Sequence, residues 1–358
     1  MFLLKTATIV IAIIVVISLI MSAGQKHRSL GKGDIKVTNL GELIKENSQT
    51  IQDEILSKVE LKELQKEEKE KYKQEEKEQK QKLKESKKGK AKSDKDSDNE
   101  SADDETTRRL YVLDFDGDVE ASDVESLREE ITAILSIANP QDEILMRLKS
   151  PGGMVHAYGL AASQLKRIGD AGYKLTIAVD EIAASGGYMM AVVADKIVAA
   201  PFSIIGSIGV LAEIPNFNRL LKKAYIDYEQ HTAGDFKRTL TMFGENTTHG
   251  REKFKQELEE THQLFKVFIN ENRPQLDVEA VATGEHWYGR QALNLGLIDE
   301  IKTSDDLILE ATKEWDVYAV KYEIRRPLSE KLSIGLQGSL DKFVTRWLHR
   351  SSQGNLYK

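Results

Sequence analysis

The sequence predicts an α/β domain built on a mostly parallel sheet, preceded by a membrane-spanning helix and a charged stalk. Three observations support this architecture. Residues 6–23 form an apolar run without charge, and residues 42–92 consist mainly of Lys, Glu and Gln. After Arg109, short strand-like apolar runs alternate with segments of helical spacing. Such alternation is typical of parallel strands joined by right-handed helical crossovers.

The N-terminal apolar run predicts a membrane anchor over residues 1–24. Thr6–Ala23 spans about 18 residues, the length that a helix needs to cross a hydrocarbon core of about 30 Å. A cleaved signal peptide is the alternative, because Lys5 gives a charged flank and Met21–Gly24 offers small residues. The basic residues that follow the run would place the main domain in the cytoplasm by the positive-inside rule. They are Lys26, Arg28, Lys32 and Lys36.

Residues 25–108 are predicted to form a charged stalk and an acidic linker. Apolar residues lie mainly in the first half of residues 42–92, at spacings that suit a helix or a weak coiled coil. Residues 93–107 are acidic and polar, so we expect them to be unfolded. The functional alternative for the stalk is an oligomerisation coil or a segment that binds a partner.

Composition excludes several function classes. The net charge of −7 argues against a general nucleic-acid binder, whose surface would be basic. The absence of cysteine excludes disulfides, thiolate metal sites and a cysteine nucleophile. No His, Asp and Glu cluster has metal-ligand spacing, and no phosphate-binding glycine motif occurs, so we expect neither a metal nor a cofactor.

The globular domain is predicted over residues 109–325. Its expected strands are residues 110–115, 143–149, 174–179 and 196–200, and its expected helices are residues 122–138 with Ser122 as N-cap, 154–168, 187–194 and 251–272. The last helix is expected to pack against the domain or in an oligomer, because its apolar positions follow helical spacing. Residues 326–358 are predicted as an amphipathic helix and tail, which docks on the domain or a neighbouring subunit or lies on a membrane.

Two small-residue loops are the strongest functional signal. Lys149–Gly153 (KSPGG) and Ala183–Tyr188 (AASGGY) each follow a strand-like run and precede a helical one. Glycines let two backbone segments approach a substrate carbonyl and direct N–H groups at it, as an oxyanion hole requires. Ser185 lies in the second loop and is the candidate nucleophile.

Several motifs together resemble the signal peptide peptidase A family of serine–lysine proteases, and most closely its SohB-type branch. They are SPGG at 150–153, AASGGY at 183–188, GSIGV at 206–210, AGDFK at 233–237 and ATGEHWYGRQALNLGLIDEI at 282–301. The resemblance covers about residues 110–324 and implies the ClpP/crotonase fold, a repeated ββα superhelix. The resemblance also implies that residues 285–301 help to complete the domain, so we expect them to be structural.

The resemblance implies a role for each candidate site residue. Ser185 would attack the scissile carbonyl, and Lys237 would be the general base, which requires burial because an ordinary lysine is protonated at neutral pH. Ser207 would orient Lys237 through its hydroxyl. For the oxyanion hole we expect the N–H groups of Gly153 and Gly186, with Gly152 as the alternative if the loop register differs.

Two alternatives at the site remain open. Ser150 is a second serine near the centre, but it precedes a proline in the loop that the family uses for the oxyanion and the substrate backbone. A histidine base would make a more common serine protease arrangement, and His156 or His231 could approach Ser185. No orienting acid is identifiable for either histidine.

The function expected from these residues is a membrane-anchored serine endopeptidase that cleaves peptides or unfolded proteins, such as signal peptide remnants, through an acyl-enzyme. The resemblance implies homo-oligomeric rings, a small apolar specificity pocket, and a bacterial inner-membrane location with the domain in the periplasm, against the charge bias. A non-catalytic scaffold that docks partners through the stalk is the alternative, since the fold alone does not guarantee proteolysis. A crotonase-like acyl-CoA enzyme is a third hypothesis.

Overall fold

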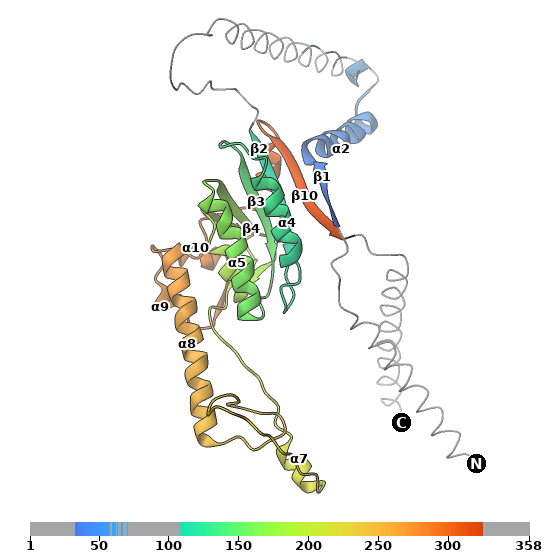
Figure 1. Ribbon diagram of the computed structural model, residues 1–358. Coiled ribbons are helices and arrows are strands. Elements are labelled where there is room, and N and C mark those ends of the chain that lie inside the picture. Colours follow the sequence, from blue (N-terminus) through green and yellow to red (C-terminus); the bar gives the residue numbers. More distant parts are fainter. Residues whose placement is uncertain are drawn as a thin grey trace, which may run out of the picture. The chain divides into compact units, whose positions relative to one another are not determined.

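The computed structural model describes residues 33–57, 59–61, 63, 66, 70 and 108–324. Its main feature is a seven-stranded sheet with the order β1-β10-β2-β3-β4-β6-β9 (Figure 1). The pairs from β10 to β9 are all parallel, which confirms the mostly parallel sheet. These strands are β1 (Gly33–Asn39), β10 (Asp316–Ile324), β2 (Arg109–Asp116), β3 (Glu143–Lys149), β4 (Lys174–Val179), β6 (Lys196–Ala199) and β9 (Glu300–Ile301).

A second, three-stranded sheet lies next to the carboxyl ends of the central strands. β5 (Ile182–Ala184) pairs parallel with β7 (Ile204–Gly206), and β7 pairs antiparallel with β8 (His286–Tyr288). An isolated bridge from Ser150 to Ala183 joins the end of β3 to β5. The two predicted small-residue loops therefore meet where β3 and β5 end.

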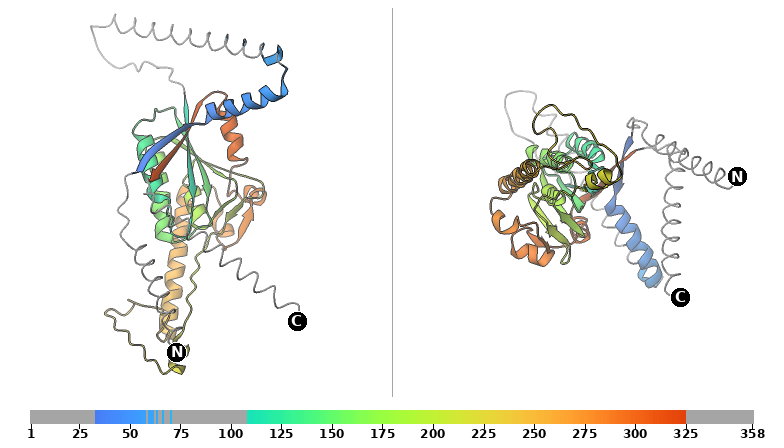
Figure 2. Two further views of the ribbon diagram at one scale, coloured as in Figure 1. Left: turned by 90° about the vertical axis from the view of Figure 1, so that its right-hand side faces the viewer. Right: turned by 90° about the horizontal axis from the view of Figure 1, so that it is seen from below.

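Helices connect the strands and cover the sheet. The helices are α2 (Leu40–Ile55), α4 (Val124–Leu135), α5 (Val155–Asp170), α6 (Gly186–Ala191), α7 (Asn218–Lys223), α8 (Thr248–Asn272), α9 (Val278–Val281), α10 (Gly289–Asn294) and α11 (Ser304–Ala311). α4, α5 and α6 are the crossovers that follow β2, β3 and β5. α4 and α5 lie side by side on one face of the sheet, as Figures 1 and 2 show, and side chains of α6 join the same core.

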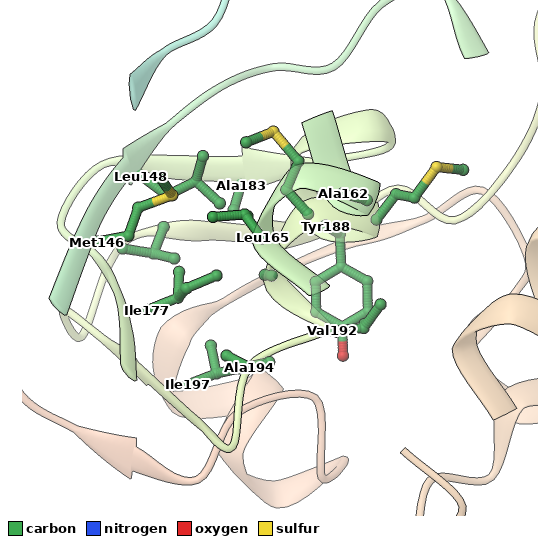
Figure 3. Close-up of a cluster of buried hydrophobic side chains, with 14 of the residues drawn as sticks. Met146, Leu148, Ala162, Leu165, Ile177, Ala183, Tyr188, Val192, Ala194 and Ile197 are labelled. Carbon is green, nitrogen blue, oxygen red and sulfur yellow. The ribbon is translucent and has the colours of Figure 1, made fainter. Parts of the chain in front are cut away.

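The core lies on both faces of the sheet, because successive side chains of a strand point to opposite faces. In β2, Tyr111, Leu113 and Phe115 join the large core under α4, α5 and α6, whereas Leu110 and Val112 join a smaller core with Ile308 of α11. Figure 3 shows part of the large core, in which α5 and the residues around α6 cover the apolar side chains of β3, β4 and β6.

Residues 209–247, which we call the arm, leave this core. None of them is buried, and α7 within the arm lies far from the sheet, at the end of the long helix α8 (Figure 1). The arm nevertheless exposes large apolar side chains, among them Leu211, Phe217, Leu220, Tyr225, Ile226 and Phe236. A single chain therefore leaves the apolar surface of the arm uncovered.

The predicted strands and helices are confirmed in place and type, with corrections at their ends. α4 is shorter than the predicted 122–138, and its N-cap is Asp123 rather than Ser122. The Ser122 N–H instead donates to Asp118 Oδ1 (2.8 Å), which closes the turn before the helix. Within the predicted stalk, α2 is helical as expected, but β1 is an unanticipated strand of the sheet.

The predicted anchor (residues 1–24), the acidic run (93–107) and the C-terminal segment (326–358) lie outside the described residues. Among the residues that the structure does describe, no helix combines the length and apolar character needed to cross a membrane.

Candidate active site

Ser185 occupies a sharp turn between β5 and α6. Its backbone has φ 51° and ψ −117°, a conformation that is strained for a residue with a side chain. The Ser185 N–H donates to the carbonyl of Gly206 in β7 (2.7 Å), and its carbonyl accepts from Met189 N–H in α6 (3.0 Å). The turn is thus fixed at both ends, and it places the serine side chain at the N-terminus of α6.

The SPGG loop packs directly against this turn. Gly152 has φ +88°, and a Cβ there would lie 2.7 Å from the Gly186 nitrogen and 2.8 Å from Ser185 Cβ. A Cβ on Gly187 would lie 2.6 Å from the carbonyl oxygen of Ser150. The glycines in both loops are therefore required by close backbone contact, as the sequence suggested.

The hydrogen bonds of the loops distinguish the possible oxyanion donors. The Gly152 N–H donates to Ser150 Oγ (3.1 Å), so it is already used. Within the described part of the chain, the Gly153 N–H has no hydrogen-bond acceptor. The Gly186 N–H opens the first turn of α6, where backbone donors have no partner within the helix. This geometry favours Gly153 and Gly186 over Gly152.

A small hollow beside Ser185 contains both favoured glycines. Its lining is mainly apolar: Gly153, Val155, Ser185, Gly186, Met189, Gly209, Val210, Thr261 and Phe265. Thr261 and Phe265 come from α8, which we expected to pack against the domain or in an oligomer rather than to line a site. Sequence reasoning missed them because their helical spacing is the same as that of ordinary core residues.

The structure brings Ser207 close to the Ser185 turn. Ala184 pairs with Gly206 between β5 and β7, so the residues that follow them lie at the ends of adjacent strands. Ser207 has φ 51°, and its N–H donates to the carbonyl of Glu285 (2.7 Å). Trp287 supports this turn, because a Cβ on Gly206 would lie 2.8 Å from its ring.

The structure does not place Lys237 with the other candidates. Lys237 is exposed on the arm and lines a different hollow, together with residues such as Tyr228, His231 and Phe243. None of these residues lines the hollow beside Ser185. The burial that a lysine base requires is therefore not provided within one chain.

The alternative base candidates are not at the hollow either. His156 is an exposed residue of α5, and the His231 side chain is 89% exposed beside Glu229 (3.5 Å). Ser150 is fully buried, its hydroxyl lies 2.5 Å from Tyr158 Oη, and it does not line the hollow beside Ser185. The described residues include no group of three or more His, Asp or Glu side chains arranged to hold a metal.

Comparisons with known proteins show which protein family this chain resembles. Residues 1–165 match the family model described as peptidase family S49 N-terminal, and residues 167–318 match peptidase family S49. The chain is 50% identical over 356 residues to the "Probable protease SohB" of Haemophilus influenzae, which covers 99% of this chain and 97% of the relative. It is 55% identical over 239 residues to the protein of the same name from Buchnera aphidicola subsp. Acyrthosiphon pisum, covering 67% and 71%.

These matches confirm the resemblance drawn from the motifs and extend it beyond the globular domain. The α/β architecture with a large parallel sheet is consistent with a ClpP-like peptidase fold. The chain is therefore a peptidase, and it belongs to peptidase family S49.

Proposed function

We propose that the chain is a serine endopeptidase in which Ser185 is the nucleophile and Gly153 and Gly186 form the oxyanion hole. The observation that carries this proposal is the strained Ser185 turn, which shares one hollow with Gly153 and Gly186. Ser185 Oγ bonds to the scissile carbonyl carbon. The carbonyl oxygen of the substrate then becomes an oxyanion, which accepts a hydrogen bond from each of the two N–H groups. Each donor contributes about 3 to 4 kcal/mol to transition-state stability.

Lys237 is the proposed base, and Ser207 is proposed to orient it. The lysine amine takes the Ser185 proton as the tetrahedral intermediate forms and then gives it to the leaving amine as the C–N bond breaks. Water hydrolyses the resulting acyl-enzyme. A lysine acts in this way only when it is withdrawn from solvent. Because Lys237 is exposed on the arm, we propose that the arm of a second copy of the chain delivers it to the Ser185 hollow.

The proposed substrates are unfolded peptides with small apolar side chains at the cleavage site, such as signal peptide remnants. The small, apolar hollow beside Ser185 supports this choice, because a large or charged side chain would not fit among Met189, Val210 and Phe265. The proposed location is the bacterial inner membrane, with residues 1–24 as the anchor and the domain in the periplasm. The uncharged run Thr6–Ala23 supports the anchor.

Labelling with a fluorophosphonate probe tests the proposed dyad. We expect the wild-type protein, solubilised from membranes with its assembly intact, to be labelled at Ser185. Ser185→Ala and Lys237→Ala should each lose labelling by at least about 1,000-fold, whereas His156→Ala should keep it. Loss of labelling in His156→Ala with retention in Lys237→Ala would assign the base to histidine, and an unlabelled wild type would favour a non-catalytic scaffold.

A further inference from the structure

A chain of buried hydrogen bonds runs from the SPGG loop to a turn on its other side. Ser150 Oγ lies 2.5 Å from Tyr158 Oη, and Tyr158 Oη lies 2.7 Å from the carbonyl oxygen of Asp118. Ser150 Oγ also accepts from Gly152 N–H (3.1 Å). Both side chains are fully buried.

The direction of each hydrogen bond follows from the donors present. A carbonyl only accepts, so Tyr158 must give its one proton to Asp118. Ser150 must therefore donate to Tyr158, which leaves a lone pair of Ser150 for the Gly152 N–H. Burial raises the pKa of Tyr158, so the phenol stays protonated in this role. The protons of this hydrogen-bond chain therefore have a single arrangement, and successive hydrogen bonds of this kind strengthen one another.

This chain of hydrogen bonds holds the two backbone segments that flank Gly153. One segment is the SPGG loop itself, reached through Ser150. The other is the turn at Asp118 and Val119, where the Val119 carbonyl accepts from Met154 N–H (2.8 Å) and would lie 2.2 Å from a Cβ on Gly153. The peptide that carries the Gly153 N–H is thus held from both sides.

The ring of Tyr158 contacts the second half of the proposed oxyanion hole. A Cβ on Gly186 would lie 2.4 Å from Tyr158 Cγ, so the ring packs directly against the backbone of Gly186. Phe115 meets the ring edge-on at a centroid distance of 6.4 Å and limits its movement. One side chain therefore supports the backbone of both Gly153 and Gly186.

We propose that Tyr158 is a positioning residue for the oxyanion hole, acting through its hydroxyl on Gly153 and through its ring on Gly186. The inference rests on the proposed function of Ser185. It predicts that the hydroxyl matters for formation of the tetrahedral adduct but not for the initial binding of a substrate or probe. Positioning errors of this kind raise the barrier to reaction without removing the donor.

Tyr158→Phe separates these effects, because it keeps the ring and removes the hydroxyl. The rate of fluorophosphonate labelling is measured against probe concentration, which gives the dissociation constant of the reversible complex and the maximal rate of adduct formation. We expect the maximal rate to fall about tenfold with the dissociation constant unchanged, a smaller loss than the about 100- to 1,000-fold that follows removal of an oxyanion donor.

Tyr188→Phe is the matched control. Tyr188 is also fully buried, and its hydroxyl also donates to a backbone carbonyl, that of Leu297 (2.9 Å). It is therefore expected to lose comparable thermal stability but to keep the labelling rate within about twofold of wild type. Ser150→Ala interrupts the same chain of hydrogen bonds, so its maximal rate of adduct formation should equal that of Tyr158→Phe. The double variant should be no slower than either single variant, because both break one network.

Three results would overturn the inference. One is a Tyr158→Phe rate within twofold of a wild type that is labelled at Ser185. Another is an equal loss of rate in Tyr188→Phe, which would make the effect a general consequence of losing a buried hydroxyl. The third is additive loss in the double variant. If Tyr158→Phe does not fold, Ser150→Ala decides the test by the same rates. An unlabelled wild type would instead refute the proposed function, on which this inference depends.

Discussion

At the scale of single residues, backbone strain is concentrated around Ser185. In the described part of the chain, the non-glycine residues with positive φ are Ala121, Ser185, Ser207 and Tyr225. Ser185 and Ser207 are candidate site residues, and Ala121 closes the turn beside Gly153. Each such conformation costs about 1 to 3 kcal/mol, which the surrounding hydrogen bonds must offset. Except at Tyr225, which lies on the arm, these strained conformations therefore occur where two backbone segments meet.

Gly152 and Gly172 separate the effect of strain from that of close contact. Their φ values are +88° and +87°, but only Gly152 has neighbours within 4 Å of an added Cβ. Both Gly152→Ala and Gly172→Ala should lose about 1 to 2 kcal/mol of stability from the unfavourable φ. Gly152→Ala should lose further stability, because its Cβ would overlap the Ser185 turn, and by displacing that turn it should reduce labelling of Ser185 by on the order of 100-fold. Equal labelling of the two variants would show that the contact at Gly152 is not functionally important.

At the scale of secondary-structure elements, an ion pair between a buried arginine and a partly exposed aspartate fixes the end of α8 to the sheet. Arg273, at the C-cap of α8, donates to both carboxylate oxygens of Asp299 (2.7 and 3.2 Å), and Asp299 accepts from Ile197 N–H of β6 (2.7 Å). The Arg273 side chain is only 3% exposed, and the Asp299 side chain is 33% exposed. Because Phe265 and Thr261 of α8 line the hollow beside Ser185, this pair also fixes one wall of the site.

Asp299→Asn should lower the free energy of unfolding by about 2 to 3 kcal/mol, because it leaves the Arg273 charge buried without a counter-charge. Burial would raise the pKa of Asp299, but the hydrogen bonds from Arg273 and Ile197 outweigh it and lower the pKa below its usual value. The stabilisation is therefore complete above about pH 4 and is lost as the pH falls through the lowered pKa. Chemical denaturation at pH 7 and below pH 4 measures the free energy of unfolding. The difference in this free energy between the wild type and Asp299→Asn should be smaller in acid.

Asp170→Asn is the control for this prediction. Asp170 forms an exposed ion pair with Lys166 (4.0 Å), and such pairs contribute little. Its effect should stay below about 0.5 kcal/mol at both pH values. A similar loss in both variants would mean that the burial of Arg273 adds nothing to what a surface ion pair contributes.

The elements also show what the sequence can and cannot predict. β2, β3 and β4 were identifiable because strands buried on both faces read as continuous apolar runs. β1 was missed because Gly33–Asn39 is mostly polar and lies at the sheet edge, where one strand partner suffices. Ser185 and its glycines were found from local motifs, whereas Tyr158 was not, because nothing in a helical apolar pattern indicates where a hydroxyl points.

At the scale of the whole molecule, the arm is the part that one chain leaves incomplete. Apolar side chains normally indicate a core, yet Leu211, Leu220 and Tyr225 are 82%, 62% and 96% exposed. Exposed apolar surface of this extent is typical of an interface with another protein chain. Lys237 lies on the same arm and away from the Ser185 hollow. The second copy proposed above would cover the apolar surface of the arm and would complete the proposed dyad in the same docking event.

Mixed assemblies test whether Lys237 acts in a neighbouring subunit. Ser185→Ala and Lys237→Ala are each expected to be inactive alone, but co-expression should restore fluorophosphonate labelling, on the Lys237→Ala chains only. If each site takes its serine from one chain and its lysine from the next in a closed ring, random mixing at equal amounts should leave about a quarter of the sites active. The Ser185→Ala, Lys237→Ala double variant co-expressed with Ser185→Ala is the control and should stay unlabelled, because it supplies no serine. Absence of restored labelling in assemblies that demonstrably contain both single variants would mean that each arm folds back and serves its own chain, so that the apolar arm would be covered from within.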